Sequence, residues 1–140
     1  MASSDSANMN ATTKRGWRWF VGLLFVVAGV NHFIIPKSYL SMMPSYLPAP
    51  AALVQISGVA EILGGIGVLI ASTRRCAAWG LILLLIAVFP ANLDVALHGW
   101  PGVNIPGWVL WCRLPLQVLF IWWVYRLYIT ESQNSEAQTR

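Results

Sequence analysis

Charged side chains are scarce in this sequence, and their scarcity argues against a soluble protein. Only 10% of the 140 residues are Asp, Glu, Lys or Arg, whereas soluble domains carry about 25%. Hydrophobic residues make up 57% of the chain, and its mean hydropathy is +0.62. Apolar windows of about 20 residues, the length that crosses a hydrocarbon core of about 30 Å, recur four times. We therefore expect an all-α integral membrane protein, with no room for a second domain.

Several chemical signatures are also missing. The two cysteines, Cys76 and Cys112, are far apart and near opposite membrane faces, which argues against a disulfide framework or a CxxC redox pair. No helical His-x-x-x-His or Glu-x-x-His pair occurs, so metal binding by His32, His98, Glu61 and Asp94 is only a weak alternative. The glycine-rich ILGGIG lacks the lysine of a phosphate-binding loop. We expect no metal, no intrinsic cofactor and no nucleic-acid partner.

The apolar windows predict a four-helix transmembrane bundle with helices at about 17–35, 52–71, 76–97 and 107–128. Residues 1–16 and 130–140 are polar and are expected to be disordered cytoplasmic tails that flank one domain at 17–129. Between the first two helices, residues 36–51 hold four prolines and two tyrosines. This composition predicts an extended cap in the membrane interface instead of a fifth helix.

The second helix carries a carboxylate, Glu61, near the middle of a lipid-length run. At about 3.6 residues per turn, Glu61 shares one stripe with small or polar residues such as Ser57 and Gly58, while the opposite face is aliphatic. Small residues let a neighbouring helix approach closely, and a charge at bilayer depth costs about 2.5 to 3.5 kcal/mol on insertion scales. We therefore expect Glu61 to face protein and to have a polar partner.

The basic residues predict the orientation of the bundle. Of nine Lys and Arg residues, all but Lys37 and Arg113 fall near the two ends of the chain or in the loop after the second helix. The positive-inside rule then places both termini in the cytoplasm. In this orientation Glu61 lies about 13 Å from the outer end of its helix.

The same orientation brings polar residues of all four helices to the outer half of the bundle. Four helices that place costly side chains at a similar depth predict a shared polar cluster. The expected ligand-pocket candidates are Asn31, His32, Glu61, Asn92, Asp94, Arg113 and Gln117. Pro90 should kink the third helix beside Asn92 and Asp94, and the sequence leaves open which of these two faces inward.

Two interpretations of the cluster compete. Arg113 is the natural counter-charge for Glu61, with His32 and Asp94 as competitors, so the two could form a buried ion pair that only fixes helix register. Alternatively, the cluster lines an outward-opening pocket for a quinone or another small amphiphile, or passes protons, with Glu61 or His32 titrating. An interface for a partner subunit is a further alternative.

The chain resembles the DoxX family of small four-helix membrane proteins. The resemblance rests on the segments GVNHFIIP, ISGVAEILGGIGVLI, TRRCAAWGLILLLIAVFPANL and LWCRLPLQ followed by WWVYRLY, and it spans about 16–129. It implies a compact bundle in a bacterial or archaeal cytoplasmic membrane and an association with redox work, since related members include a membrane subunit of thiosulfate:quinone oxidoreductase. The chain lacks a cysteine pair, a recognisable flavin or haem signature and a soluble domain, so a partner would bring the redox centre.

We therefore expect a multi-pass DoxX-like protein of a prokaryotic inner membrane that serves as an accessory or quinone-interacting subunit of a redox system. Bound quinone is the only expected cofactor, and no catalytic residue is assigned. The candidate partners are the lipid bilayer, a soluble redox enzyme and further copies of the chain. The alternative is a non-catalytic assembly or chaperone-like protein whose buried ion pair is purely structural.

Overall fold

The computed structural model describes the backbone of residues 2–130 and the side chains of residues 13–128. This part of the chain is entirely helical apart from turns and loops, with the elements α1 (Ala2–Ile34), α2 (Pro36–Ser41), α3 (Pro50–Gly67), α4 (Arg74–His98), α5 (Gly107–Val124) and a closing π-helix, η1 (Tyr125–Thr130). Met1 and most of the expected carboxyl-terminal tail, residues 131–140, lie outside the described residues.

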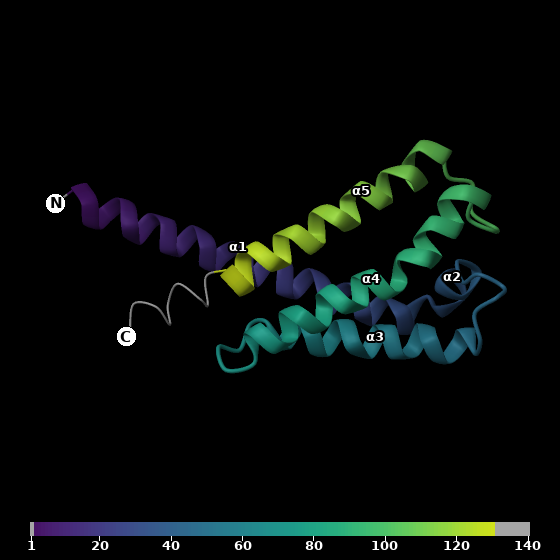
Figure 1. The fold of residues 1–140 in the computed structure, drawn as a ribbon, viewed down its shortest axis with the longest axis horizontal. Coiled ribbons are helices and arrows are strands. Elements are labelled where there is room, and N and C mark those ends of the chain that lie inside the picture. The colour runs from purple at the N-terminus through teal and green to yellow at the C-terminus, as the bar shows by residue number, and fades with distance from the viewer. Residues whose placement is uncertain (1, 131–140) are drawn as a thin grey trace.

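The four long helices run back and forth along the long axis of the molecule, which is horizontal in Figure 1. Within the described residues, four segments are long and apolar enough to cross a membrane, namely Thr13–Ile34, Pro50–Gly67, Arg74–His98 and Gly107–Tyr128. The start of α1, the α3–α4 turn and the end of η1 share one end of the bundle, called here the terminal end, while α2 and the 99–106 loop form the α2 end. The predicted all-α, four-helix membrane architecture is confirmed.

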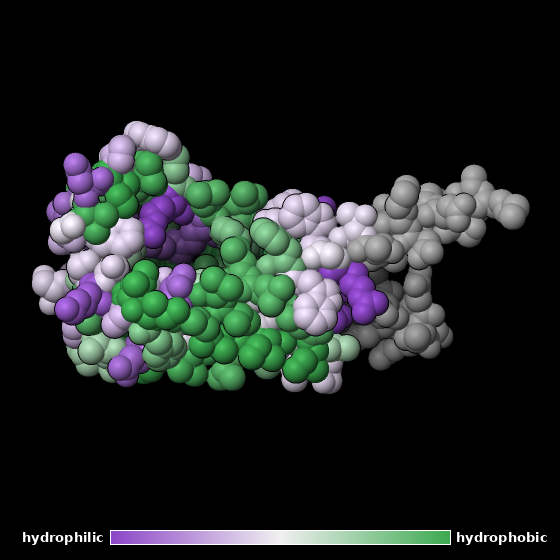
Figure 2. Space-filling model, turned by 180° about the vertical axis from the view of Figure 1, so that it is seen from behind, coloured by the Kyte–Doolittle hydropathy of each residue, from purple (hydrophilic) through white to green (hydrophobic). Residues whose placement is uncertain are grey.

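Apolar side chains cover much of the outside of the bundle. Ile34, Leu63 and Leu83 are each at least 64% exposed, which suits residues that contact lipid tails. Figure 2 shows one face of this surface as a broad hydrophobic belt with hydrophilic residues toward both ends. The larger cluster of buried apolar residues lies toward the terminal end, where Val21, Val68, Leu81, Val124 and Tyr128 pack together, and a smaller one of Met42, Val95 and Leu110 lies toward the α2 end.

Glycines bring α1 and α3 into close contact. A Cβ on Gly29 would lie 2.6 Å from the Gly58 carbonyl oxygen, and a Cβ on Gly65 would lie 2.6 Å from the Gly22 carbonyl oxygen. The two glycines of each helix are seven residues apart, about two turns, so both pairs meet along one antiparallel seam. This is the close approach that the small-residue stripe of the second helix predicts, and it places Glu61 between two contact points with α1.

The helix bounds differ from the predicted ones in three places. The first helix begins at Ala2, so the segment expected as a disordered tail continues α1 instead, because no proline stops a helix before Ile34. Six residues of the expected extended cap form α2, since Pro36 at the first turn is compatible with a helix. The second long helix ends at Gly67, four residues early, and the third begins at Arg74.

The early end of α3 has a local cause. The Thr73 hydroxyl donates to the Gly67 carbonyl at 2.9 Å, and Arg74 Nε donates to the Val68 carbonyl at 3.0 Å. These side chains satisfy carbonyls that a longer helix would use, and glycines near the end weaken the helix. The turn between α3 and α4 therefore lies at 68–73, whereas the predicted helix bounds leave 72–75 between the two helices.

Two features of α4 and η1 also bear on the predictions. Pro90 lies inside α4, and the carboxyl-terminal half of that helix turns away from α3 in Figure 1. Tyr128 near the end of the last span is a residue type enriched at membrane interfaces, yet it is fully buried and donates its hydroxyl to the Arg18 carbonyl at 2.7 Å. This tyrosine joins η1 to α1 instead of contacting the membrane interface.

Candidate functional site

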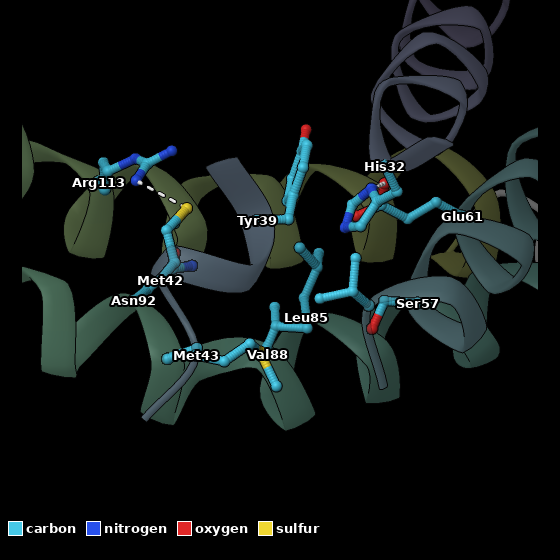
Figure 3. A pocket seen from close by; sticks show the side chains of 12 residues that line it. His32, Tyr39, Met42, Met43, Ser57, Glu61, Leu85, Val88, Asn92 and Arg113 are labelled. Atoms are coloured by element: carbon cyan, nitrogen blue, oxygen red, sulfur yellow. Dashed lines mark hydrogen bonds and ion pairs between the residues drawn. The ribbon is translucent and has the colours of Figure 1, made fainter. Parts of the chain in front are cut away.

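A cavity of about 180 Å³ opens between the helices at the α2 end. It lies within the half of the bundle where the sequence predicts the polar cluster, and α2 covers one side of it (Figure 3). We call it the α2-end cavity. Its lining residues are His32, Tyr39, Met42, Met43, Val54, Ser57, Glu61, Leu85, Val88, Ala91, Asn92 and Arg113.

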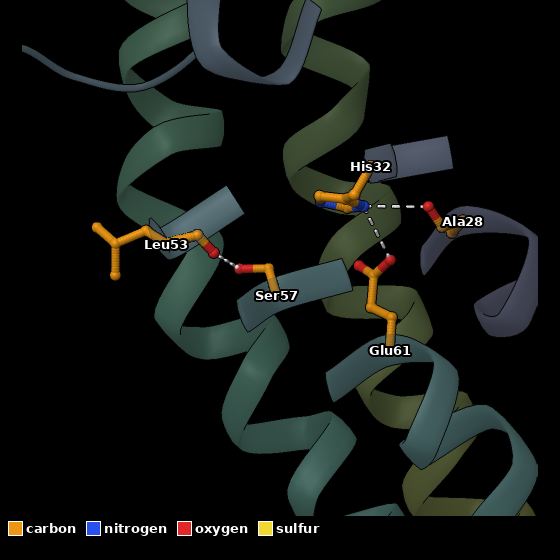
Figure 4. A network of polar contacts seen from close by, with 5 residues as sticks. All are labelled: Ala28, His32, Leu53, Ser57 and Glu61. Atoms are coloured by element: carbon orange, nitrogen blue, oxygen red, sulfur yellow. Dashed lines mark hydrogen bonds and ion pairs between the residues drawn. The ribbon is translucent and has the colours of Figure 1, made fainter. Parts of the chain in front are cut away.

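His32 is presented by the last turns of α1 and is only 8% exposed. Its Nδ1 lies 3.1 Å from the Ala28 carbonyl oxygen, one helical turn earlier (Figure 4). Because a carbonyl only accepts hydrogen bonds, Nδ1 carries the proton and Nε2 of the neutral ring is left as an acceptor. The imidazole also stacks on the Tyr39 ring with centroids 3.8 Å apart, so α2 holds the ring in place.

Glu61 reaches toward His32 from the middle of α3. Its Oε2 lies 3.5 Å from His32 Nδ1, which is an ion-pair distance but longer than a normal N–H···O bond (Figure 4). Oε2 is buried, and no hydrogen-bond donor reaches it from the described residues. Buried polar atoms are almost always paired, so this oxygen is ready for a donor that a bound molecule would bring. The nearby Ser57 hydroxyl is already used, since it donates to the Leu53 carbonyl at 2.8 Å.

The expected ion pair between Glu61 and Arg113 is wrong, because the described side chains pair Glu61 with His32 instead. Tyr39 lies between Arg113 and the His32–Glu61 pair in Figure 3, and this ring separates the two charges. Arg113 contacts groups on its own side of the cavity: its Nη1 lies 4.0 Å from Met42 Sδ, and its guanidinium lies over the Trp100 ring at 4.8 Å. Both charged groups line the cavity, but on different sides of it.

Tyr39 is close enough to both charged groups of the cavity, Glu61 and Arg113, for each to affect its pKa. Burial raises the pKa of the Tyr39 phenol above its ordinary value, and the negative charge of Glu61 raises it further, while Arg113 opposes both effects. The phenol therefore stays protonated at neutral pH and remains able to donate a hydrogen bond.

Asn92 and Gln117 form a polar bridge between α4 and α5. Asn92 Nδ2 donates to Gln117 Oε1 at 3.0 Å, and Gln117 Nε2 donates to the Leu85 carbonyl. Pro90 has no N–H, so the Ile86 carbonyl, four residues earlier, lacks its usual backbone donor. The Leu85 carbonyl that accepts from Gln117 lies directly beside this gap in the helix hydrogen bonds. Asn92 thus lines the cavity, whereas the buried Gln117 supports it from behind.

Asn31 and Asp94 do not line the α2-end cavity, although the sequence places them among the candidates. Asp94 instead accepts from His98 Nδ1 at 3.1 Å within α4, near the 99–106 loop. The sequence leaves open whether Asn92 or Asp94 faces inward, and the structure shows that Asn92 faces the cavity. Of the seven candidates, four line the cavity, namely His32, Glu61, Asn92 and Arg113.

Sequence reasoning missed the part of the wall that α2 supplies. Tyr39, Met42 and Met43 come from the segment expected to lie flat in the membrane interface. Trp100 Nε1 donates to Ser41 Oγ at 3.0 Å and joins the 99–106 loop to α2, so the two connecting segments cover the cavity together. A signal that could have predicted this wall is Tyr39, an aromatic residue in a proline-bounded segment between two long helices.

The arrangement suits a small planar molecule with polar groups at two ends. Arg113 and the Asn92 amide offer donors on one side, while Glu61 Oε2 and His32 Nε2 offer acceptors on the other, and Val54, Leu85 and Val88 supply apolar wall. A volume of about 180 Å³ is below the roughly 300 Å³ of typical ligand sites, so it would hold a ring but not an attached chain. Within the described residues, no group of three or more His, Cys, Asp or Glu is placed to hold a metal ion.

Comparison with known proteins yields one family. A family model described as a domain of unknown function, DUF8561, matches residues 21–128, which include the carboxyl-terminal part of α1, the whole of α3, α4 and α5, and every residue of the α2-end cavity. No curated protein and no solved structure matches the chain.

Proposed function

This chain belongs to the DUF8561 family, a domain of unknown function. From the α2-end cavity and the resemblance to the DoxX family, we propose that it is a DoxX-like quinone-interacting membrane protein, an accessory subunit of a redox system. The observation that carries the proposal is Glu61 Oε2, a buried oxygen that accepts no hydrogen bond from the described residues and lies in a cavity that also presents His32 and Arg113. The resemblance to the DoxX family supports the redox role independently of the cavity.

A quinone headgroup matches the polarity of the cavity from end to end. Its carbonyl oxygens accept hydrogen bonds, which Arg113 and Asn92 can donate, and the hydroxyl of the reduced quinol donates, which Glu61 and His32 can accept. The volume of about 180 Å³ accommodates the ring, while an isoprenoid tail would leave between the helices into lipid. The protein would bind and orient the ring, and a soluble partner enzyme would supply the redox centre.

The basic residues support a location for this site. Lys14, Arg15, Arg18, Arg74 and Arg75 lie at the terminal end, and by the positive-inside rule this distribution supports a cytoplasmic location of both termini, with the α2-end cavity toward the outer face. The prokaryotic inner membrane is what the DoxX resemblance implies. Carboxyl-terminal fusions to a fluorescent protein and to alkaline phosphatase test this orientation. Fluorescence without phosphatase activity is expected, and the reverse pattern would overturn it.

The binding proposal is tested by titrating a short-chain quinone into purified protein in nanodiscs, with tryptophan fluorescence as the readout. Arg113→Gln and Glu61→Gln should each raise Kd about tenfold or more, since a hydrogen bond to a charged group contributes about 1.5 to 3 kcal/mol. Asp94→Asn is the matched control, because it changes a carboxylate at the α2 end that does not line the cavity. Thermal melting establishes that each variant is folded.

A second candidate function is a non-catalytic assembly protein. The observation that favours it is the polar bridge from Asn92 through Gln117 to the Leu85 carbonyl, which joins α4 to α5 with no need of a ligand. In that case the His32–Glu61 pair would be the structural ion pair, in place of Glu61 with Arg113. Three results together would favour this function. Quinone does not bind, Glu61→Gln lowers the melting temperature, and the protein still purifies in a complex with a protein that it helps to assemble.

A further inference from the structure

The four long helices do not pack into a fully closed ring. α1 packs on α3, α3 on α4, and α4 on α5, whereas the backbones of α1 and α5 stay largely apart. In Figure 1, α5 diverges from α1 toward the α2 end. The side chains along this α1–α5 boundary therefore determine where the bundle is closed to the surrounding lipid and where it is open.

Aromatic rings close the α1–α5 boundary in the terminal half of the bundle. The ring centroids of Trp17 and Trp123 are 5.1 Å apart, and those of Phe25 and Phe120 are 6.4 Å apart. Two turns beyond Phe25, His32 makes its contacts with α1, α2 and α3. Within residues 13–128, no hydrogen bond, ion pair or ring contact joins α1 to α5 on the α2 side of Phe25. The aromatic closure thus ends at Phe25 and Phe120.

The boundary is open beyond this closure and leads into the α2-end cavity. Leu116 lies one turn from Phe120 on the same face of α5, yet it is 49% exposed. Arg113, about two turns from Phe120, lines the cavity from α5. His32, about two turns from Phe25, lines it from α1. A molecule between the two helices at this level would therefore reach the polar groups of the cavity.

The opening lies at the level of the hydrocarbon layer. Phe25 and Leu116 belong to the candidate spans Thr13–Ile34 and Gly107–Tyr128. Figure 2 views the bundle from the side and shows a hollow toward the α2 end, with hydrophilic residues inside it and hydrophobic residues around it. An opening on the side of a spanning bundle meets lipid tails, whereas an opening at its end meets water. Polar groups inside and apolar residues at the mouth match the two parts of an amphiphile.

We propose that the α2-end cavity opens sideways into the bilayer between α1 and α5, and that it takes a membrane-dissolved ring compound with one apolar tail. The ring enters through this side opening, and the tail stays in it against Leu116 and Phe120. This inference rests on the proposed function, because the ring is the quinone headgroup assigned to the cavity. The volume of about 180 Å³ holds a ring without a chain, and the side opening supplies the space that the chain needs.

The arrangement of the helices also allows the side opening to widen. α1 is held against α3 by its glycine contacts, whereas α5 follows the bent α4 through the 99–106 loop. The side of the opening that α5 forms can therefore move while the side that α1 forms stays in place. A ring can pass without separating His32 from Glu61.

The test locates the tail directly by photolabelling the full chain in nanodiscs. The probe is a quinone whose tail carries a diazirine close to the ring, and mass spectrometry identifies the labelled peptides. Excess decyl-tailed quinone should suppress labelling of residues 24–28 and 116–120, because these segments flank the side opening. Suppressible labelling confined to α3 and α4, or confined to α2 and the 99–106 loop, would overturn the proposal.

A variant that fills the side opening tests the same point by affinity. Native mass spectrometry in nanodiscs compares a decyl-tailed quinone with a tailless quinone that has the same ring. Leu116→Trp should weaken binding of the tailed compound about tenfold, since the bulky side chain occupies the space of the tail, and should leave the tailless one unchanged. Val118→Trp is the matched control, because Val118 is 61% exposed and lies about 200° away from Leu116 around α5. It should change neither affinity.

The outcomes separate this inference from the proposed function. If neither quinone binds the wild type, the proposed function fails and this inference fails with it. If the tailless quinone binds but Leu116→Trp and Val118→Trp have equal effects on the tailed one, only the side opening is refuted. Thermal melting establishes that both variants are folded, and the photolabelling of the wild type decides the question if Leu116→Trp is not.

Discussion

His32 and Tyr39 lie face to face, with ring centroids 3.8 Å apart and ring planes 24° from parallel. The contact joins the last turns of α1 to α2 and covers the side of the α2-end cavity where Glu61 lies. Tyr39 also lies between the two charged groups that the sequence suggests as a pair. One aromatic ring from a six-residue helix thus determines which polar groups of the cavity meet.

The raised pKa of Tyr39 predicts a stability change in alkaline solution. A raised pKa means that the folded protein retains the phenolic proton at pH values where the unfolded chain has lost it. The contribution of this group is therefore fully present below about pH 10 and is lost as the pH rises through that region. Above about pH 10 the wild type should lose more free energy of unfolding than Tyr39→Phe, and below it the two should change in parallel. Denaturant unfolding over a pH series measures both, and an equal alkaline decline would contradict the assignment.

Arg113 and Trp100 should be energetically coupled. The guanidinium lies 4.8 Å from the ring centroid, and a partly desolvated cation–π pair contributes about 0.5 to 2 kcal/mol. A double-mutant cycle with Arg113→Gln and Trp100→Leu, measured as the free energy of unfolding, should give a coupling energy in this range. Arg126 and Trp122, at 5.5 Å on the exposed surface, provide the comparison and should give a smaller value. A coupling energy of zero for Arg113 and Trp100 would show that the contact is only geometric.

Gln117 should matter more to stability than Asn92. Gln117 contacts both Asn92 and the Leu85 carbonyl, so Gln117→Leu leaves two polar groups without this partner, whereas Asn92→Leu affects only Gln117. An unsatisfied buried group costs about 1 to 3 kcal/mol, although hydrogen bonds between membrane helices average about 0.6 kcal/mol. Unfolding in mixed micelles should therefore show the larger loss for Gln117→Leu. The reverse order would argue against the bridge between α4 and α5.

Gly29 should not tolerate a larger side chain. Gly29→Ala places a methyl group 2.6 Å from the Gly58 carbonyl oxygen and should destabilise the bundle by about 1 to 3 kcal/mol as the helices move apart. Gly80→Ala in α4 is the control, because a Cβ there meets no atom within 4 Å, and alanine favours a helix by about 0.5 to 1 kcal/mol over glycine. Thermal melting should shift in opposite directions for the two variants. A similar shift for both would mean that the seam is not tightly packed.

The sequence predicts the helical framework well because its signals are local and periodic. Hydrophobic length locates the four spans, and the helical period places Gly22, Phe25, Gly29 and His32 on the buried face of α1. The stripe around Glu61 likewise faces protein, since Gly58 and Gly65 are buried. These conclusions depend only on residue type and spacing along one helix.

The partners within the cavity depend on contacts between segments and could not be read from one helix. Glu61 and Arg113 lie at a similar depth, which makes them plausible partners until Tyr39 is placed between them. Asn92 and Asp94 are about 200° apart on an ideal helix, and Pro90 disturbs their phase, so only the folded α4 shows which one faces the cavity. The early end of α3 follows from side chains of Thr73 and Arg74 that lie beyond the apolar run.

The glycine seam limits how the bundle can move. Gly22 with Gly65 and Gly29 with Gly58 meet at two points two turns apart, so sliding α1 along α3 by one residue would bring side chains against backbone at both points. These two helices should therefore translate and tilt as a single rigid pair. Any change in the size of the α2-end cavity must then come from its other walls, namely α2 and the half of α4 beyond Pro90. A molecule that enters the cavity would be admitted by the connecting segments and the bent helix, while the pair that carries His32 and Glu61 stays fixed.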